Sequence, residues 1–202
     1  MADQDILIGP GRLYRAPLAT ANPDESTVAF GAAWGGSWTD MGDLIEGSPV
    51  TLSMPEEFTK VYTEQSTSAK NAVRTRREPM IKCSLAEHSI ANMAIVLQGT
   101  AETTAAAGGG QKGFSEIPFG DQSEVDFYKW GIEAFRKDSS DNIHPVRWFF
   151  HKGYIRMSGD TAYAKRTPTG VPVEITILGD GSQTAGEELG ILQIVTAQAT
   201  AT

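Results

Sequence analysis

Short apolar runs separated by glycine and proline are the feature that most limits how this chain can fold. The 202 residues include 21 glycines and 10 prolines, which interrupt regular elements and favour turns. Apolar and polar residues alternate from Val50 to Met54 and again from Val171 to Leu178. Alternation with a period of two is typical of half-buried strands. The sequence therefore favours many short strands over a helical bundle.

A single segment has the pattern of a helix. Ser84 and Glu87 match the S-x-x-E capping box, and apolar residues at helical spacing follow as far as Leu97. Gly99 stands where a glycine commonly ends a helix. We predict a helix over about residues 85–98 that flanks a mainly β, antiparallel sandwich or barrel. The length suits one domain that covers residues 1–202.

Three segments of this domain are expected to lie outside its core. Glu64–Pro79 (EQSTSAKNAVRTRREP) contains four basic residues and almost nothing apolar, which predicts a long polar loop at 64–79. The low-complexity segment 99–113 (GTAETTAAAGGGQKG) predicts a flexible loop. From about residue 186 to 202 the sequence predicts a C-terminal arm that ends in a tail rich in alanine, threonine and glutamine.

Charge is distributed unevenly along the chain. The formal net charge is −8, yet residues 65–82 hold five bases and one acid. An acidic protein of this kind is a poor DNA binder, because affinity for phosphates comes mainly from cationic contacts. No apolar run approaches the roughly 18 residues of a membrane helix, and the N-terminus lacks the pattern of a secretory signal. We therefore expect no membrane partner.

Patterns of catalytic and metal-binding residues are absent from the sequence. The glycines at Gly108–Gly110 precede Lys112, but the spacing of a phosphate-binding loop is missing. No G-x-S-x-G nucleophile elbow occurs, and Cys83 is expected to be a small buried apolar side chain. The histidines do not fall at metal-ligand spacing: His88, His144 and His151. The sequence thus predicts neither an enzyme nor a bound cofactor.

The order of features from Trp34 to Gly99 is more informative than any single motif. An aromatic, glycine-rich turn leads into the acidic turn Gly42–Gly47 (GDLIEG), and a strand, the polar loop, a short strand and the capped helix follow. A strand and an Asp turn come later, at Gly170–Asp180. This order resembles the major tail tube proteins of long-tailed, siphovirus-like bacteriophages and gene transfer agents.

The resemblance implies a structural protein of the virion tail, assembled in the host cytoplasm. It implies a β-sandwich with a flanking helix that forms hexameric rings, stacked head to tail into a tube. Inner strands of neighbouring copies join into a barrel around a channel, through which DNA passes during ejection without specific binding. The tape measure protein and the tail terminator are the further partners that the resemblance implies.

In the resembling family the loop after the first major strand reaches the adjacent ring. The residues of this chain that we expect in the inter-ring contact are Glu64, Lys70, Arg74, Arg76, Arg77 and Glu78. Acidic side chains are candidates for their partners or for the lumen: Asp40, Asp43, Glu46, Glu56 and Glu57. Opposite charges set orientation and register, head-to-tail contacts generate open filaments, and an acidic lining repels DNA.

Other interpretations remain open from the sequence. The chain is also compatible with another tube-like or tail-completion component, such as a terminator, a baseplate ring or a secretion-system tube. A monomeric β-barrel that binds a ligand through Trp34, Trp38, Tyr62 and Trp130 belongs to a different class of function. The polar loop itself also fits an ordinary exposed hairpin loop, because runs of charge are usually solvated.

Overall fold

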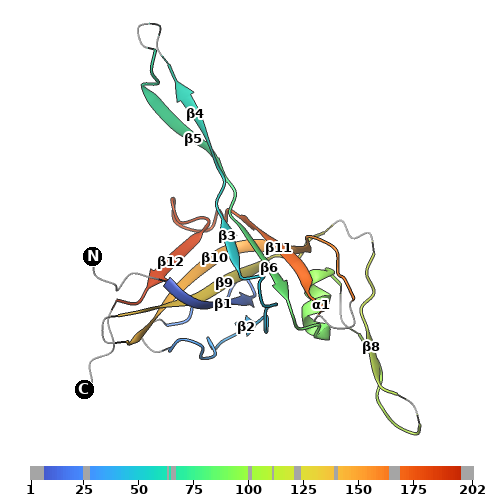
Figure 1. Ribbon diagram of the computed structural model, residues 1–202. Coiled ribbons are helices and arrows are strands. Elements are labelled where there is room, and N and C mark those ends of the chain that lie inside the picture. The colour runs from blue at the N-terminus through green and yellow to red at the C-terminus, as the bar shows by residue number, and fades with distance from the viewer. Residues whose placement is uncertain are drawn as a thin grey trace.

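An antiparallel sheet, in which many neighbouring strands are not consecutive in the sequence, forms the body of the computed structural model (Figure 1). The structure describes residues 7–24, 28–62, 64, 67–99, 102–110, 112–120, 124–138, 141–163 and 169–196. The strand order is β2-β1-β9-β10-β11-β6-β3, and β12 also pairs with β10. The strands of this sheet are β1 (Leu7–Ala16), β2 (Thr39–Asp40), β3 (Thr51–Ser53), β6 (Met80–Leu85), β9 (Tyr128–Lys137), β10 (Ile143–Met157), β11 (Val171–Leu178) and β12 (Gly190–Ile194). The mainly β, antiparallel fold predicted from the sequence is confirmed.

The long strand β10 joins the two halves of this sheet, of which one contains β2, β1, β9 and β12 and the other contains β11, β6 and β3. Its first half pairs with β9 and β12, and its second half pairs with β11, with a register shift between Phe150 and Gly153. Gly153 lies so close to its neighbours that a Cβ atom there would come within 2.9 Å of the Thr176 carbonyl oxygen. A glycine at this register shift therefore lets the sheet bend tightly without a clash.

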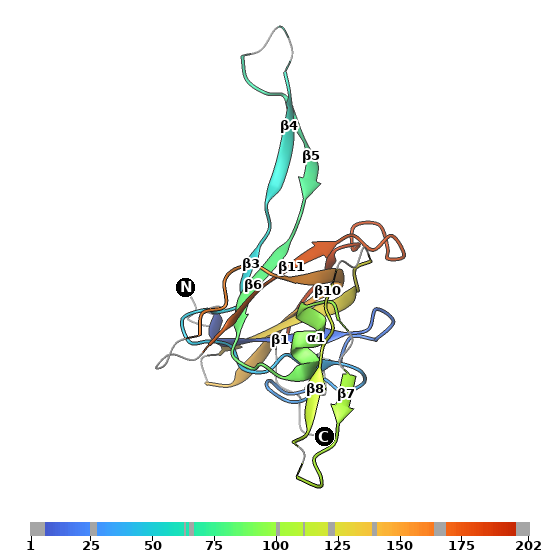
Figure 2. The same cartoon turned by 90° about the vertical axis from the view of Figure 1, so that its right-hand side faces the viewer.

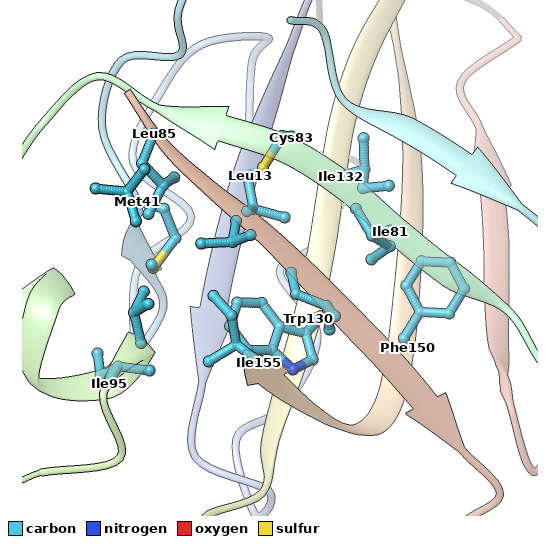
Figure 3. Packing of buried hydrophobic residues seen from close by; sticks show 14 of the residues in the cluster. Leu13, Met41, Ile81, Cys83, Leu85, Ile95, Trp130, Ile132, Phe150 and Ile155 are labelled. Carbon is cyan, nitrogen blue, oxygen red and sulfur yellow. The ribbon is translucent and has the colours of Figure 1, made fainter. Parts of the chain in front are cut away.

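The bend places a hydrophobic core between the two halves of the sheet (Figure 3). Leu13 and Trp130 contribute to it from β1 and β9, whereas Ile81 and Ile175 contribute from β6 and β11. Each such side chain, when fully buried, stabilises the fold by about 1.5–3 kcal/mol. Cys83 is buried in the same core, and this burial raises the pKa of its thiol to about 12. Its predicted role as a buried apolar side chain is confirmed.

The helix α1 (Ile90–Val96) begins later than the sequence predicted. Its N-cap is Ser89, whose side chain accepts a hydrogen bond from the Asn92 amide at 3.2 Å. Ser84 instead lies in β6 opposite Pro172, so the predicted start near residue 85 is wrong. Sheet pairing with β11 prevails there over the local capping pattern. None of the described helices is long and apolar enough to cross a bilayer.

The end of the helix depends on Gln98, although the sequence predicted a glycine cap at Gly99. Gln98 adopts the left-handed conformation with φ of 54°, and the Gly99 amide donates to the Ala94 carbonyl at 2.7 Å. These are the positions of a Schellman motif with glutamine in place of the usual glycine. The Gln98 side chain also donates to the Ile155 carbonyl at 3.2 Å and accepts from the Asp126 amide at 2.8 Å. It therefore ties the helix to β10.

Two hairpins project from opposite sides of the body (Figures 1 and 2). The first consists of β4 (Glu56–Val61) and β5 (Asn71–Arg77), and the second of β7 (Glu102–Ala105) and β8 (Phe114–Glu116). The predicted loops at 64–79 and 99–113 thus each contain a strand. The predicted C-terminal arm also differs in part, because Gly190–Ile194 pairs with β10, while residues 197–202 lie outside the described residues.

Candidate functional site

The first hairpin, with Glu78 at its base, projects from the body (Figure 1), and we call Glu56–Glu78 the first arm. It continues the ladder of β3 and β6 beyond Met54 and Pro79. Pro55 and Pro79 lack an amide hydrogen, so the ladder is interrupted at this junction. The Glu78 amide donates to the Pro55 carbonyl at 3.2 Å, and the Ile177 amide donates to the Pro79 carbonyl at 3.0 Å. These bonds fasten the base of the arm to the body.

Apolar side chains of the first arm are open to solvent. Phe58 is 52% exposed, Val61 46%, Tyr62 59% and Val73 53%. A two-stranded ribbon cannot bury both of its faces and is marginally stable alone. By the register, Phe58 and Tyr62 fall on one face of the ribbon, and Val61 and Val73 fall on the other. Large exposed apolar surfaces are typical of sites that another molecule covers.

The charged residues of the first arm pair mainly with one another. Arg74 lies 3.3 Å from the Glu56 carboxylate, and Arg77 contacts the same carboxylate. Arg76 lies 2.6 Å from Glu78, and this hydrogen bond raises the Arg76 pKa. All of the predicted contact residues lie on this arm: Glu64, Lys70, Arg74, Arg76, Arg77 and Glu78. Two of the predicted acidic partners, Glu56 and Glu57, lie on the same arm, where they face its own arginines.

Of the other predicted acids, Asp40 lies in β2, which is on the side of the body away from the first arm (Figure 1). Asp43 and Glu46 lie in the turn after β2, which contacts the end of β6 far from the arm, where the Ala86 amide donates to the Asp43 carbonyl at 2.8 Å. Asp40 pairs with Arg12 at 3.4 Å. The turn Gly42–Gly47 lines much of an open groove of about 460 Å³. The first arm and this acidic turn thus occupy different ends of the molecule, and no described contact joins them.

A buried ion pair on the outer side of β9 and β10 was not predicted from the sequence. Glu133 and Arg147 are both buried, and the Arg147 Nε atom donates to the Glu133 carboxylate at 3.0 Å. The carboxylate also accepts from the Gly31 amide at 3.0 Å and from the Trp34 indole at 3.2 Å. Arg147 in turn donates to the Val28 carbonyl at 2.6 Å. The pair therefore holds the segment 28–38 against the sheet.

The aromatic residues proposed for a ligand pocket lie in separate places. Trp34 stacks on Tyr14 with ring centroids 4.1 Å apart, and Trp38 packs beside it. Trp130 is buried in the main core, and Tyr62 is on the first arm. These side chains do not converge on one cavity, so the ligand-binding barrel has no support from their positions. Among the described residues there is no group of three or more side chains arranged to hold a metal ion.

Comparison with known families agrees with this arrangement. A family model described as "Phage tail tube protein" matches residues 1–187. A comparison with curated proteins gave no match. The family match covers nearly the whole chain, including the first arm, the acidic turn and every strand of the bent sheet except β12. This chain belongs to the phage tail tube protein family.

Proposed function

We propose that this structural protein of the virion tail assembles into hexameric rings that stack head to tail. The stacked rings form the tail tube, and DNA passes through its lumen during ejection. Self-assembly into a tube with other tail components follows from the family. The ring size, the role as a DNA conduit and contacts with the tape measure protein and the tail terminator belong to the proposal.

The first arm is the observation that carries this proposal. It leaves the body as a two-stranded ribbon and exposes Phe58, Val61, Tyr62 and Val73. A second copy that covers these side chains would remove apolar surface from water, which favours association by about 25 cal/mol per Å². We assign the contact between rings to this arm.

The separation of the arm from the acidic turn supports head-to-tail stacking. An arm on one side of a copy meets a different surface of the next copy, and such heterologous contacts continue into a filament. Asp40, Asp43 and Glu46, in and after β2, are our candidates for the receiving surface or the lumen. The net charge of −8 supports passage of DNA, because a negatively charged lining repels the phosphates.

Removal of the first arm tests this assignment. The Glu78 amide and the Pro55 carbonyl are hydrogen-bonded, so the ends of the arm are adjacent. A short glycine-containing turn in place of residues 57–77 therefore leaves β3 and β6 paired. We expect single rings without tubes in negative-stain images, whereas the intact protein forms tubes at the same concentration.

Near-ultraviolet circular dichroism is the control for this variant, because the buried tryptophans report on the body and not on the arm. Unchanged tryptophan bands together with loss of tubes support the assignment. Tubes formed by the armless variant as readily as by the intact protein would contradict it.

A further inference from the structure

The three arginines of the first arm are already engaged within that arm. Arg74 and Arg77 both contact the carboxylate of Glu56, whose side chain is only 22% exposed although it lies on a two-stranded ribbon. Arg76 lies between Glu78 at 2.6 Å and Glu57 at 4.0 Å. Each arginine must give up or share such a contact before it can pair with a carboxylate of another copy.

A bulge in β5 explains how two arginines reach one glutamate. Residues three apart on a regular strand point to opposite faces, so Arg74 and Arg77 would normally diverge. The register places Glu57 opposite Arg76 and Phe58 opposite Arg74, which leaves Thr75 as an extra residue. The Thr75 hydroxyl donates to the Glu57 carbonyl at 3.2 Å. This extra residue turns Arg74 to the face of Arg77, because a bulge adds one residue to the strand and shifts the alternation.

Arg74 also makes a cation–π contact within the arm. Its guanidinium carbon lies 5.8 Å from the centre of the Phe58 ring, directly across the ladder. Such a stacked arrangement is attractive, and it holds both long side chains in place. Arg74 thus links the ion pairs at the base of the arm to the aromatic side chain above them.

The two lysines farther along the arm differ from the arginines in their contacts. Lys60 stands opposite Ala72, and Lys70 follows the tip, with its amide donating to the Val61 carbonyl at 2.9 Å. Both lysines are exposed, and within the described part of the chain no ion pair is formed by either. By the alternation of the strand, Lys60 falls on the same face as the exposed side chains of Phe58 and Tyr62.

We propose that Arg74, Arg76 and Arg77 are positioning residues that fix the shape of the first arm. The positive charges that the arm offers to a second copy of this chain are then those of Lys60 and Lys70, near the exposed apolar side chains. The inference rests on the proposed function in that the arm contacts another copy. Cross-strand pairs matter here because a two-stranded ribbon without a core has little else to keep its register.

An exchange of charges within the arm distinguishes two roles of the arginines: fixing the shape of the arm, or contacting the neighbouring copy directly. The first variant carries R74E, R76E and R77E, which places like charges across the ladder. The second adds E56R, E57R and E78R, which restores opposite charges at these positions and the net charge of the arm. We expect the first variant to lose amide hydrogen-exchange protection in β4 and β5 and to raise the concentration needed for tubes by about tenfold or more. The exchanged variant is expected to recover both protection and assembly.

The lysines are tested in parallel by K60E with K70E, and K60R with K70R is the matched control. The reversed pair is expected to keep the exchange protection of the arm and to weaken assembly, while the conservative pair behaves as the natural sequence does. Recovered protection without recovered assembly in the exchanged variant would overturn the proposal, because the arginine side chains would then contact the neighbouring copy directly. Unchanged assembly of the reversed lysine pair would also overturn it.

Hydrogen exchange is measured on unassembled protein at low concentration, so this readout does not depend on tubes. If the natural sequence forms no tubes at all, the proposed function fails, and the exchange data still decide whether the arginines shape the arm. Equal protection of the arm in all variants would show that they do not.

Discussion

At the scale of single residues, the buried pair of Glu133 and Arg147 has the largest consequences for stability. Each partner is removed from water, and each makes further hydrogen bonds to the segment 28–38. Breaking a buried pair is costly because the remaining charge has no compensation, whereas replacing both partners by apolar residues is often tolerated. The pair therefore fixes where this segment lies more than it adds net stability.

We expect Glu133→Ala to lower the free energy of unfolding by about 3–5 kcal/mol, because it leaves the Arg147 guanidinium buried without its carboxylate. Urea denaturation followed by tryptophan fluorescence measures this loss. The double variant Glu133→Leu with Arg147→Met is expected to be more stable than the single one, because no charge is then buried. A loss below about 1 kcal/mol for Glu133→Ala, as an exposed pair would give, would show that the pair is solvated in solution.

At the scale of elements, the base of the second hairpin, Glu102–Glu116, is packed closely against the end of α1. Gly99 lies beside Pro118 and Ile117, and a Cβ atom at Gly99 would come within 2.6 Å of the Pro118 carbonyl oxygen. The side chain of Gln98 holds the same region through its bonds to β10 and Asp126. The base of this hairpin is therefore closely packed although its strands are short.

We expect Gly99→Ala to destabilise the protein by roughly 1–3 kcal/mol, as insertion of a methyl group into a packed site usually does. Gly108→Ala is the matched control, because nothing lies within 4 Å of a Cβ atom there and its φ is not in the left-handed region. Thermal unfolding of the two variants gives the comparison. An equal melting temperature for both would mean that the chain moves away from Gly99 at no cost.

The strand β11, which has a buried face, could be predicted from the sequence, whereas the exposed strand β5 could not. The alternation in Val171–Leu178 gives β11 because its odd-numbered residues face the core. The strand Asn71–Arg77 was interpreted as a loop, because both of its faces are open to water and it carries no apolar period. The capping box at Ser84 was misleading because β6 continues through that residue to pair with β11. Local patterns do not report such long-range pairing.

The internal contacts of the first arm could not be predicted from the sequence. The polar stretch 64–79, selected for its basic residues, holds β5 but not β4, which precedes it. The pairing of its arginines with Glu56 depends on the bulge at Thr75, which has no distinct sequence signal. Glu133 and Arg147 were missed because their partnership joins two strands across the ladder.

At the scale of the whole molecule, the two hairpins extend from opposite sides of a bent sheet (Figures 1 and 2). The body has its own core, whereas the first arm exposes large apolar side chains and offers little to hold itself in place. We propose that further copies cover these exposed side chains. The chain belongs to the phage tail tube family, and contacts between copies of such a protein build a tube in the virion tail.

Cryo-electron microscopy of the purified, concentrated protein tests this account most directly. We predict tubes of stacked hexameric rings, with the first arm of each copy covered by a copy in the adjacent ring and Lys60 and Lys70 at that contact. Particles that remain monomeric at all concentrations and salt conditions, or tubes in which the first arm stays uncovered in solvent, would contradict it.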